Sequence, residues 1–109
     1  MAFTDFSLEK YEKEIQHSGK LILLDFWNED CAVCKNLSKV LEALVSERED
    51  IKVFSVKAKD AEDLCQQYKI MTVPSLVFIK EGTVRKKTMG FKSKETLTSI
   101  IESVLQEAE

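Results

Sequence analysis

The sequence is poor in residues that interrupt regular secondary structure, and it has no long hydrophobic run. Its 109 residues include one proline and three glycines, too few for a flexible linker between domains. Uninterrupted apolar stretches are short, as in Leu21 to Leu24, whereas a helix needs about 20 apolar residues to cross a bilayer. We therefore expect a single domain over residues 1–109 and no membrane-spanning segment.

Positive charge is not in excess either. Lys and Arg number 16 against 19 Asp and Glu, which gives a net charge of −3 and a pI near 5.3. Affinity for nucleic acids depends on clustered Lys and Arg that neutralise phosphates, so this balance argues against a nucleic-acid partner. The first residues carry no basic region followed by an apolar stretch, which predicts no secretory signal and a cytoplasmic location.

Cysteine is scarce and odd in number. Three cysteines, two of them close together, cannot provide the set of disulfides that stabilises many small secreted domains. In a reducing compartment, a close pair such as Cys31 and Cys34 indicates a catalytic or metal-binding role rather than a structural bridge.

What the sequence does contain is a series of strand-length and helix-length hydrophobic patterns. Short apolar runs predict buried strands, and apolar residues at spacings of three and four predict amphipathic helices. Ser7 and Ser93 are placed to cap the first and last helices, and Glu81-Gly82 predicts a hairpin turn. The predicted fold class is α/β, with a central mixed β-sheet, helices on both faces, and a parallel part before the hairpin. In chain order we expect a helix over 8–17, a strand over 21–27, a long helix that includes 37–45, a strand over 51–56, a short helix over 61–68, strands over 75–80 and 83–89, and a helix over 93–107.

Cys31 and Cys34 fall where the strand over 21–27 has ended and the long helix begins. Unpaired N–H groups and the positive end of the helix dipole favour an anion there, which lowers the pKa of a cysteine and provides a thiolate nucleophile. The second sulfur, one helical turn further on, is close enough to form a disulfide with the first. This geometry predicts that Cys31 attacks a substrate disulfide and that Cys34 resolves the mixed disulfide. Two alternatives stay open at this point: two small core residues, or half of a zinc site for which only Cys65 and His17 remain as further ligands.

A wider set of residues resembles one protein family. Asp25-Phe26-Trp27 precedes the Cys-x-x-Cys-Lys motif, Val73-Pro74-Ser75 follows it further along the chain, and Gly90 ends the last predicted strand. The combination resembles the thioredoxin family along essentially the whole chain. The resemblance implies the thioredoxin fold and a thiol/disulfide oxidoreductase, a dithiol reductant of protein disulfides that is recharged by thioredoxin reductase. It also implies that no metal or tightly bound organic cofactor is needed, since the two sulfurs hold the electrons, and we expect a monomer.

The same resemblance implies roles for residues around the cysteines. The family residue that matches Asp25 is the general acid/base for the second cysteine. A carboxylate inside an apolar strand is costly to bury, so Asp25 should be protonated or paired, unless the strand ends early and places it on a surface turn. The family proline that matches Pro74 follows a cis peptide bond beside the redox pair, and the residue before it, here Val73, offers its backbone to an extended substrate. The alternative for Pro74 is an ordinary loop proline before an edge strand. Trp27 matches a tryptophan that packs against the active site, so Trp27, Val73 and Pro74 are the expected substrate-binding residues.

The redox motif departs from the usual Trp-Cys-Gly-Pro-Cys of the family, because residues 30–34 read Asp-Cys-Ala-Val-Cys. Asp30 places a negative charge beside the developing thiolate, whereas Lys35 acts in the opposite direction. These departures leave two alternative functions open. One is a thioredoxin-like binding module in which the thiols play little part, and the other is a dedicated electron donor to one partner enzyme.

Three further features have structural interpretations. Cys65, beside Leu64 in the short predicted helix, is expected to fill the core, with a regulatory thiol as the alternative. His17 is expected to cap the end of the first helix. The basic run over residues 85–87 is expected on an edge strand, where charge discourages strand addition, with contact to an acidic partner as the alternative.

Overall fold

The computed structural model describes residues 4–5, 7–17 and 19–107. The predicted helices and strands all form, and their bounds differ from the predictions by at most one residue wherever both ends were predicted. In chain order the elements are β1 (Thr4–Asp5), α1 (Leu8–His17), β2 (Leu21–Trp27), α2 (Ala32–Glu47), β3 (Ile51–Lys57), the 3-10 helix η1 (Ala58–Asp60), α3 (Glu62–Gln67), β4 (Ser75–Lys80), β5 (Thr83–Met89) and α4 (Lys94–Glu107).

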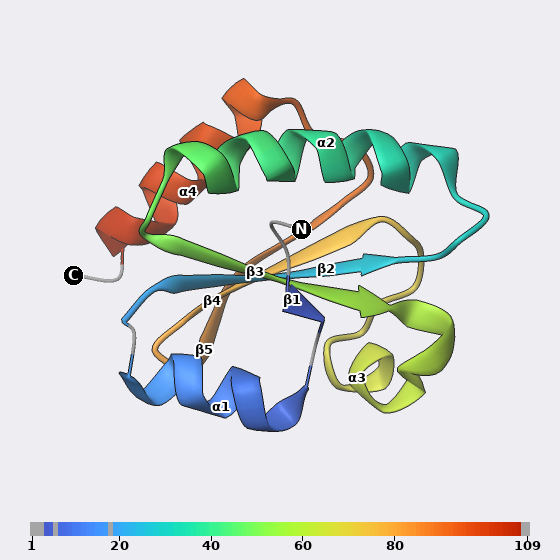
Figure 1. The fold of residues 1–109 in the computed structure, drawn as a ribbon, viewed down its shortest axis with the longest axis horizontal. Helices are drawn as coiled ribbons and strands as arrows, with labels where there is room; N and C mark the ends of the chain where they lie inside the picture. Colours follow the sequence, from blue (N-terminus) through green and yellow to red (C-terminus); the bar gives the residue numbers. More distant parts are fainter. Residues whose placement is uncertain (1–3, 6, 18, 108–109) are drawn as a thin grey trace.

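β2 is the middle strand of a five-stranded sheet whose order is β1-β3-β2-β4-β5. It pairs with β3 in parallel and with β4 antiparallel, and β4 and β5 form the antiparallel hairpin. α2 and α4 cover one face of the sheet, and α1 and α3 cover the other (Figure 1). The predicted mixed sheet with helices on both faces is therefore confirmed.

Alternation along β2 divides its apolar side chains between two cores. Leu21 and Leu23 pack in the core beneath α2 and α4, whereas Ile22, Leu24 and Phe26 pack in the core on the other face. All five are fully buried or nearly so, and burying each such side chain stabilises the fold by about 1.5–3 kcal/mol. A slip of one residue would exchange the two faces, so the burial holds β2 in one register.

Local signals end the elements as predicted. The hydroxyls of Ser7 and Ser93 each accept a hydrogen bond, at 3.1 Å, from the backbone N–H three residues on, which satisfies a free donor at the start of α1 and of α4. Between β4 and β5, Glu81 and Gly82 both have positive φ, 52° and 78°. A tight two-residue hairpin turn requires this backbone.

Two short elements lie outside the predictions. β1 has only two residues, too few for any periodicity, and it forms because its backbone pairs in parallel with β3 at Phe54 and Ser55. η1 follows β3 directly and leads the chain into α3. The side chain of His17, with its expected cap, lies outside the described residues, as do the side chains of Leu8 and Ile15. Within the described ranges, no helix is long and apolar enough to cross a membrane.

Candidate functional site

The pair Cys31 and Cys34 lies at the junction of β2 and α2. Cys31 is the N-cap residue of α2, with extended backbone (φ −122°, ψ 101°), and its Sγ accepts a hydrogen bond from the Cys34 N–H at 3.1 Å. The two Cα atoms are 5.2 Å apart, and a disulfide joins the side chains. Cys31 is partly exposed, whereas Cys34 is only 4% exposed. The predicted placement of the pair at a helix start is confirmed.

Asp25 is a buried carboxyl in the middle of the sheet. It is 3% exposed, and its Oδ1 has no hydrogen-bond partner among the described residues. Burial raises the pKa of Asp25 to about 7, because removal from water disfavours the ionised form. β2 continues to Trp27, so the alternative of an aspartate on a surface turn is wrong. Asp25 shares a face of the sheet with Leu23, and the buried side of α2, which includes Cys34, packs onto that face.

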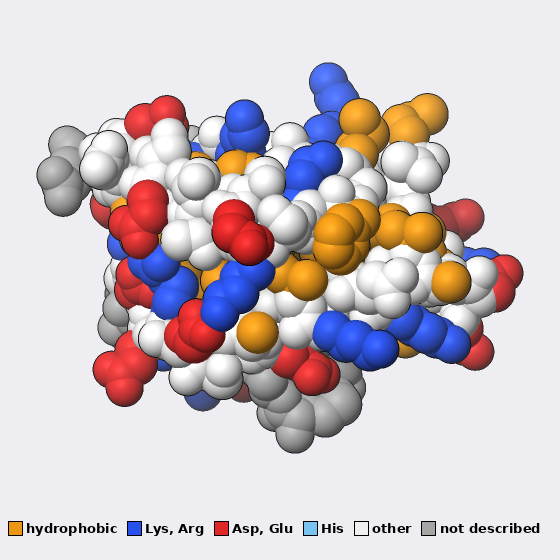
Figure 2. Space-filling model, turned by 90° about the horizontal axis from the view of Figure 1, so that it is seen from above, with side chains coloured by type: hydrophobic (Ala, Val, Ile, Leu, Met, Phe, Trp, Pro, Cys, Tyr) orange, Lys and Arg blue, Asp and Glu red, His pale blue; other side chains and the backbone are white. Residues whose placement is uncertain are grey.

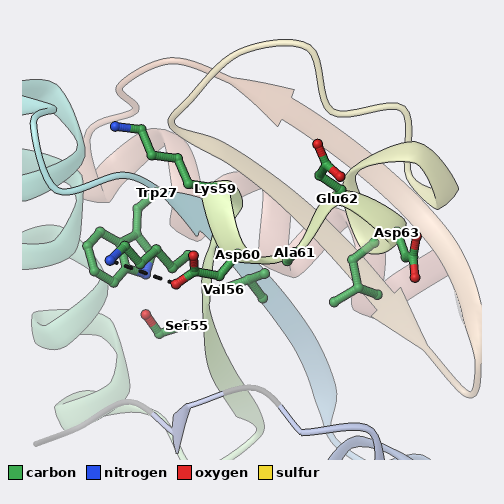
Figure 3. Close-up of a pocket in the computed structure, with 10 residues that line it drawn as sticks. Trp27, Ser55, Val56, Lys59, Asp60, Ala61, Glu62 and Asp63 are labelled. Carbon is green, nitrogen blue, oxygen red and sulfur yellow. Dashed lines mark ion pairs between the residues drawn. The ribbon is translucent and has the colours of Figure 1, made fainter.

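Trp27 ends β2 and forms one wall of a pocket. Its ring is partly exposed, but the indole Nε1 is buried and finds no hydrogen-bond partner within the described part of the chain. The pocket has a volume of about 750 Å³ and lies between Trp27 and the segment that runs from β3 into α3. Figure 3 shows Trp27 and Ser55 at one end of this pocket and Glu62 and Asp63 at the other. Trp27 therefore places an indole N–H without a described partner near the junction of β2 and α2, where the redox pair lies.

Val73 and Pro74 are joined by a cis peptide bond, as the resemblance implied. The Pro74 carbonyl accepts a hydrogen bond from the Gly90 N–H at 2.8 Å, which ties the start of β4 to the residue after β5. Ser75, the first residue of β4, pairs with Phe26 near the end of β2, so Pro74 lies at the same end of the sheet as the redox pair. β4 is an inner strand, so the alternative of a proline before an edge strand is wrong.

Exposed apolar side chains cluster in this part of the molecule. Val33 lies within the redox motif and is 45% exposed, and Met89 and Phe91, on either side of Gly90, are 57% and 47% exposed. Figure 2 shows hydrophobic side chains gathered toward the end of the molecule where α2 begins, with charges of both signs around their edge and over the other end. Sequence reasoning missed Met89 and Phe91 because they belong to no motif. The pairing of Met89 with Ser75 and the hydrogen bond from Gly90 to Pro74 bring them to this end of the sheet.

Two lysines that sequence reasoning also missed pair with the acids beside the redox motif. The Lys59 Nζ lies 3.6 Å from an Asp30 carboxylate oxygen, and Lys57 forms an ion pair with Glu29. The Lys59 backbone N–H also donates to the Asn28 side-chain oxygen at 3.1 Å. These contacts hold the β2–α2 loop against η1. The negative charge of Asp30 is therefore partly balanced by Lys59 of η1, which follows the neighbouring strand β3. The redox motif by itself does not indicate this pairing.

Cys65 and the basic run of β5 differ in part from their expected settings. Cys65 is only partly buried; it packs against the core under α1 and α3, and its thiol donates to the Ala58 carbonyl at 3.7 Å. Burial raises the pKa of the Cys65 thiol. β5 is an edge strand, as predicted, but Lys87 is not simply solvated, because its Nζ donates to the carbonyls of Tyr68 and Lys69.

Comparisons with known proteins agree with this geometry. A family model described as Thioredoxin matches residues 3–103. The thioredoxin of Bacillus subtilis (strain 168) is 33% identical over 85 residues, 77% of this chain and 82% of that protein. The thioredoxin of Acidithiobacillus ferridurans is 31% identical over 98 residues, 89% of this chain and 91% of that protein. A solved thioredoxin variant from Halobacterium salinarum NRC-1 shares the fold, with a TM-score of 0.79 at 24% identity over 94% of this chain and 88% of that one. The chain therefore belongs to the thioredoxin family, and it is a thiol/disulfide oxidoreductase.

Proposed function

We propose that the chain is a reductant of protein disulfides in which Cys31 is the attacking thiol and Cys34 the resolving thiol. The observation that carries this assignment is the contrast between the two sulfurs. Cys31 is partly exposed at the N-cap of α2, where the helix terminus stabilises a thiolate, whereas Cys34 is 4% exposed beneath it. A substrate disulfide therefore reaches Cys31 first.

The proposed reaction has two exchange steps. In the first, the Cys31 thiolate attacks one sulfur of the substrate disulfide, a mixed disulfide forms, and the other substrate sulfur leaves as a thiolate. In the second, Cys34 loses its proton and attacks the Cys31 sulfur, which releases the second substrate thiolate. Two electrons pass from the protein dithiol to the substrate, and the protein disulfide is the oxidised product.

Asp25 is proposed as the general acid/base for Cys34. Its place on the α2 face of the sheet and its unpaired, buried Oδ1 support this role. A pKa of about 7 leaves comparable amounts of carboxyl and carboxylate near neutral pH, which suits a group that must both accept and return a proton. Each turnover then requires Asp25 to take the proton of Cys34 in the second step and to release it before the next.

Trp27, Val73 and Pro74 are proposed to bind the substrate chain. Thioredoxins act on protein disulfides and are reduced by thioredoxin reductase, and we extend both partners to this protein. The place of Pro74 at the same end of the sheet as the redox pair supports the assignment, as do the exposed apolar residues Met89 and Phe91 next to it. Apolar surface at this position suits an extended, partly hydrophobic segment around the substrate disulfide.

A dedicated electron donor to one partner enzyme is the second candidate, and the charged loop beside the redox pair favours it. Asp30 and Lys59 are both exposed, and each carries a charge that a partner surface can recognise. Complementary charges raise association rates and select among partners more than they raise affinity. If the charge of Asp30 selects the partner, Asp30→Asn should slow electron transfer to the physiological partner several-fold while small disulfides are reduced as before.

The test of the proposed function is reduction of insulin by dithiothreitol, with and without the protein. We expect the wild type to accelerate the reaction, Cys31→Ser to abolish the acceleration, and Cys65→Ser, the matched control outside the motif, to retain it. The Cys34→Ser variant should accumulate mixed disulfides, which identify the partners by mass spectrometry. A wild-type protein without any activity on insulin or on a captured partner would instead indicate a binding module.

We further propose that the protein works as a monomer in the cytoplasm. Among the exposed large hydrophobic residues of the described chain, most lie around the proposed substrate site, which supports a surface that contacts substrates rather than a second copy. Sedimentation velocity at micromolar concentration tests the first point, and fractionation of the source cells tests the second. A stable dimer or a membrane-enclosed location would contradict them.

A further inference from the structure

The buried position of Asp25 raises the question of where its proton goes, and the inference here rests on the proposed role of Asp25. The carboxyl is 3% exposed, so it does not exchange protons with bulk water directly. In each turnover it accepts one proton from Cys34 and must lose it before it can act as a base again. A polar route between Asp25 and solvent lets the carboxyl lose this proton without waiting for Cys34 to be reduced again.

The neighbours of Asp25 on its face of the sheet leave few routes. Leu23, two residues earlier on β2, and Leu76, its register partner on β4, are both fully buried and apolar. On the other side, the register partner on β3 is Ser55, which is partly exposed. Register partners project their side chains to the same face, so Ser55 is the cross-strand neighbour of Asp25 on this face. Trp27, two residues later on β2, is the other partly exposed neighbour on this face.

Ser55 and Trp27 line the same pocket, and they lie together at one end of it (Figure 3). At about 750 Å³ the pocket has room for several water molecules, and six of the ten residues that line it are polar or charged. Trp27 belongs to this end of the pocket, and Asp25 is the cross-strand partner of Ser55. Asp25 Oδ1 and Trp27 Nε1 are both buried, and neither has a partner among the described residues. Buried polar atoms of this kind are normally satisfied by water, so this end of the pocket is suited to hold it.

We propose that Ser55 is a positioning residue that connects Asp25 to the water of this pocket and so provides the outlet for the catalytic proton. The proton passes from the Cys34 thiol to the Asp25 carboxylate as the Cys34 thiolate forms. It then leaves the Asp25 carboxyl along the Ser55 hydroxyl, which accepts one proton and donates another, to pocket water and bulk solvent. The carboxylate is restored, and no other reactant is required.

The two lysines near this route pair with carboxylates other than Asp25. Lys57, two residues after Ser55 on the same face, pairs with Glu29 and lies 3.8 Å from Asp60, the ion pair drawn in Figure 3. Lys59 extends from the pocket toward Asp30. Desolvation is the cause of the raised pKa of Asp25, and no charged partner contributes to it. Among the residues whose side chains the structure describes, Cys34 lies on the buried side of α2, Leu76 pairs with Asp25 from β4, and Glu62 and Asp63 line the pocket from α3.

The test compares Ser55→Val, which removes the hydroxyl and places two methyl groups on Cβ, with Ser55→Thr, which keeps a hydroxyl on the same β-branched shape. Both are made in the wild type and in Asp25→Asn. The rate of the second exchange step is followed between pH 6 and 9 by stopped-flow fluorescence of Trp27, the only tryptophan in the sequence. Urea denaturation of each variant verifies folding, and Ser55→Ala replaces Ser55→Val if the latter is unfolded.

We expect Ser55→Val to slow the second step about tenfold at pH 7 and to flatten its rise with pH, whereas Ser55→Thr stays within about twofold of the wild type. In Asp25→Asn, neither substitution at Ser55 should change the rate further. A Ser55→Val protein as fast as the wild type, or an equal loss in both backgrounds, overturns the inference about Ser55 alone. If Asp25→Asn by itself leaves the second step unchanged, the proposed role of Asp25 fails, and the inference fails with it.

Discussion

Replacing Asp25 by asparagine should make the protein more stable, by an amount that depends on pH. The fold raises the pKa of this carboxyl from 3.8 to about 7 by burial, so the folded protein holds its proton more tightly than the unfolded chain. The wild type therefore loses stability as the pH rises from about 4 through 7, where ionisation of Asp25 favours the unfolded chain. The asparagine amide has the same shape and does not ionise, so the variant lacks this loss.

The magnitude follows from the two pKa values. At 1.36 kcal/mol per pH unit, the stability difference between Asp25→Asn and the wild type should grow, relative to its value at pH 3, to about 2 kcal/mol at pH 5 and about 4 kcal/mol at pH 8. Above pH 8 it should stay constant, because Asp25 is then ionised in both the folded and unfolded wild type.

Urea denaturation of the disulfide form at pH 3, 5, 6, 7 and 8 measures this difference, and the disulfide form excludes titration of Cys34. Asp63→Asn, at an exposed position on α3, is the matched control for the loss of one carboxyl. A difference between Asp25→Asn and the wild type that is the same at every pH would refute the reasoning. The variant should at the same time be slower in the second exchange step, so that stability and rate change in opposite directions.

Three further predictions concern other parts of the chain. In the reduced protein at pH 7, iodoacetamide should modify Cys31 well before Cys65. The reason is that the N-terminus of α2 favours the Cys31 thiolate, whereas burial raises the pKa of the Cys65 thiol. Peptide mass mapping measures both rates, and equal rates would contradict the assignment. Arg48→Ala should lower the free energy of unfolding by about 1–2 kcal/mol, since its side chain is 17% exposed and its guanidinium contacts two carboxylates at 2.7 and 2.8 Å, one of them on α4. An unchanged urea midpoint would show that these pairs contribute nothing. Leu41→Ala should lower the free energy of unfolding by about 2–5 kcal/mol, because this side chain of α2 is fully buried. Glu42→Ala, at the exposed neighbouring position, is the control. Similar small losses for both variants would mean that the core collapses around the cavity.

Much of the fold follows from patterns that are local in the sequence. The bounds of β2, β4 and β5 agree with the predictions, because short apolar or β-rich runs bounded by turn residues can form little else. The hairpin at Glu81 and Gly82 and the caps at Ser7 and Ser93 are also local, since each depends on one side chain or on one backbone conformation. β1 and η1 escaped prediction because two or three residues carry no periodicity and form only against β3 and its continuation.

The candidate site divides in the same way. The placement of Cys31 and Cys34 could be predicted, since the end of a strand, the start of a helix and a spacing of three are all written in one short stretch of chain. The partners of the site could not. Lys59 meets Asp30, and Ser55 lies beside Asp25, only because β3 aligns in parallel with β2 in one register.

The sequence by itself determined the elements, their order and the position of the dithiol at a helix start, because these depend on hydrophobic periodicity, capping and spacing between near neighbours. Only the tertiary structure decided the pKa of Asp25, the pairing of the charges around the dithiol and the pocket beside Trp27. The physical reason is that solvation and Coulomb interactions depend on distance in space. Strand pairing and helix packing set those distances between residues that are far apart in the chain.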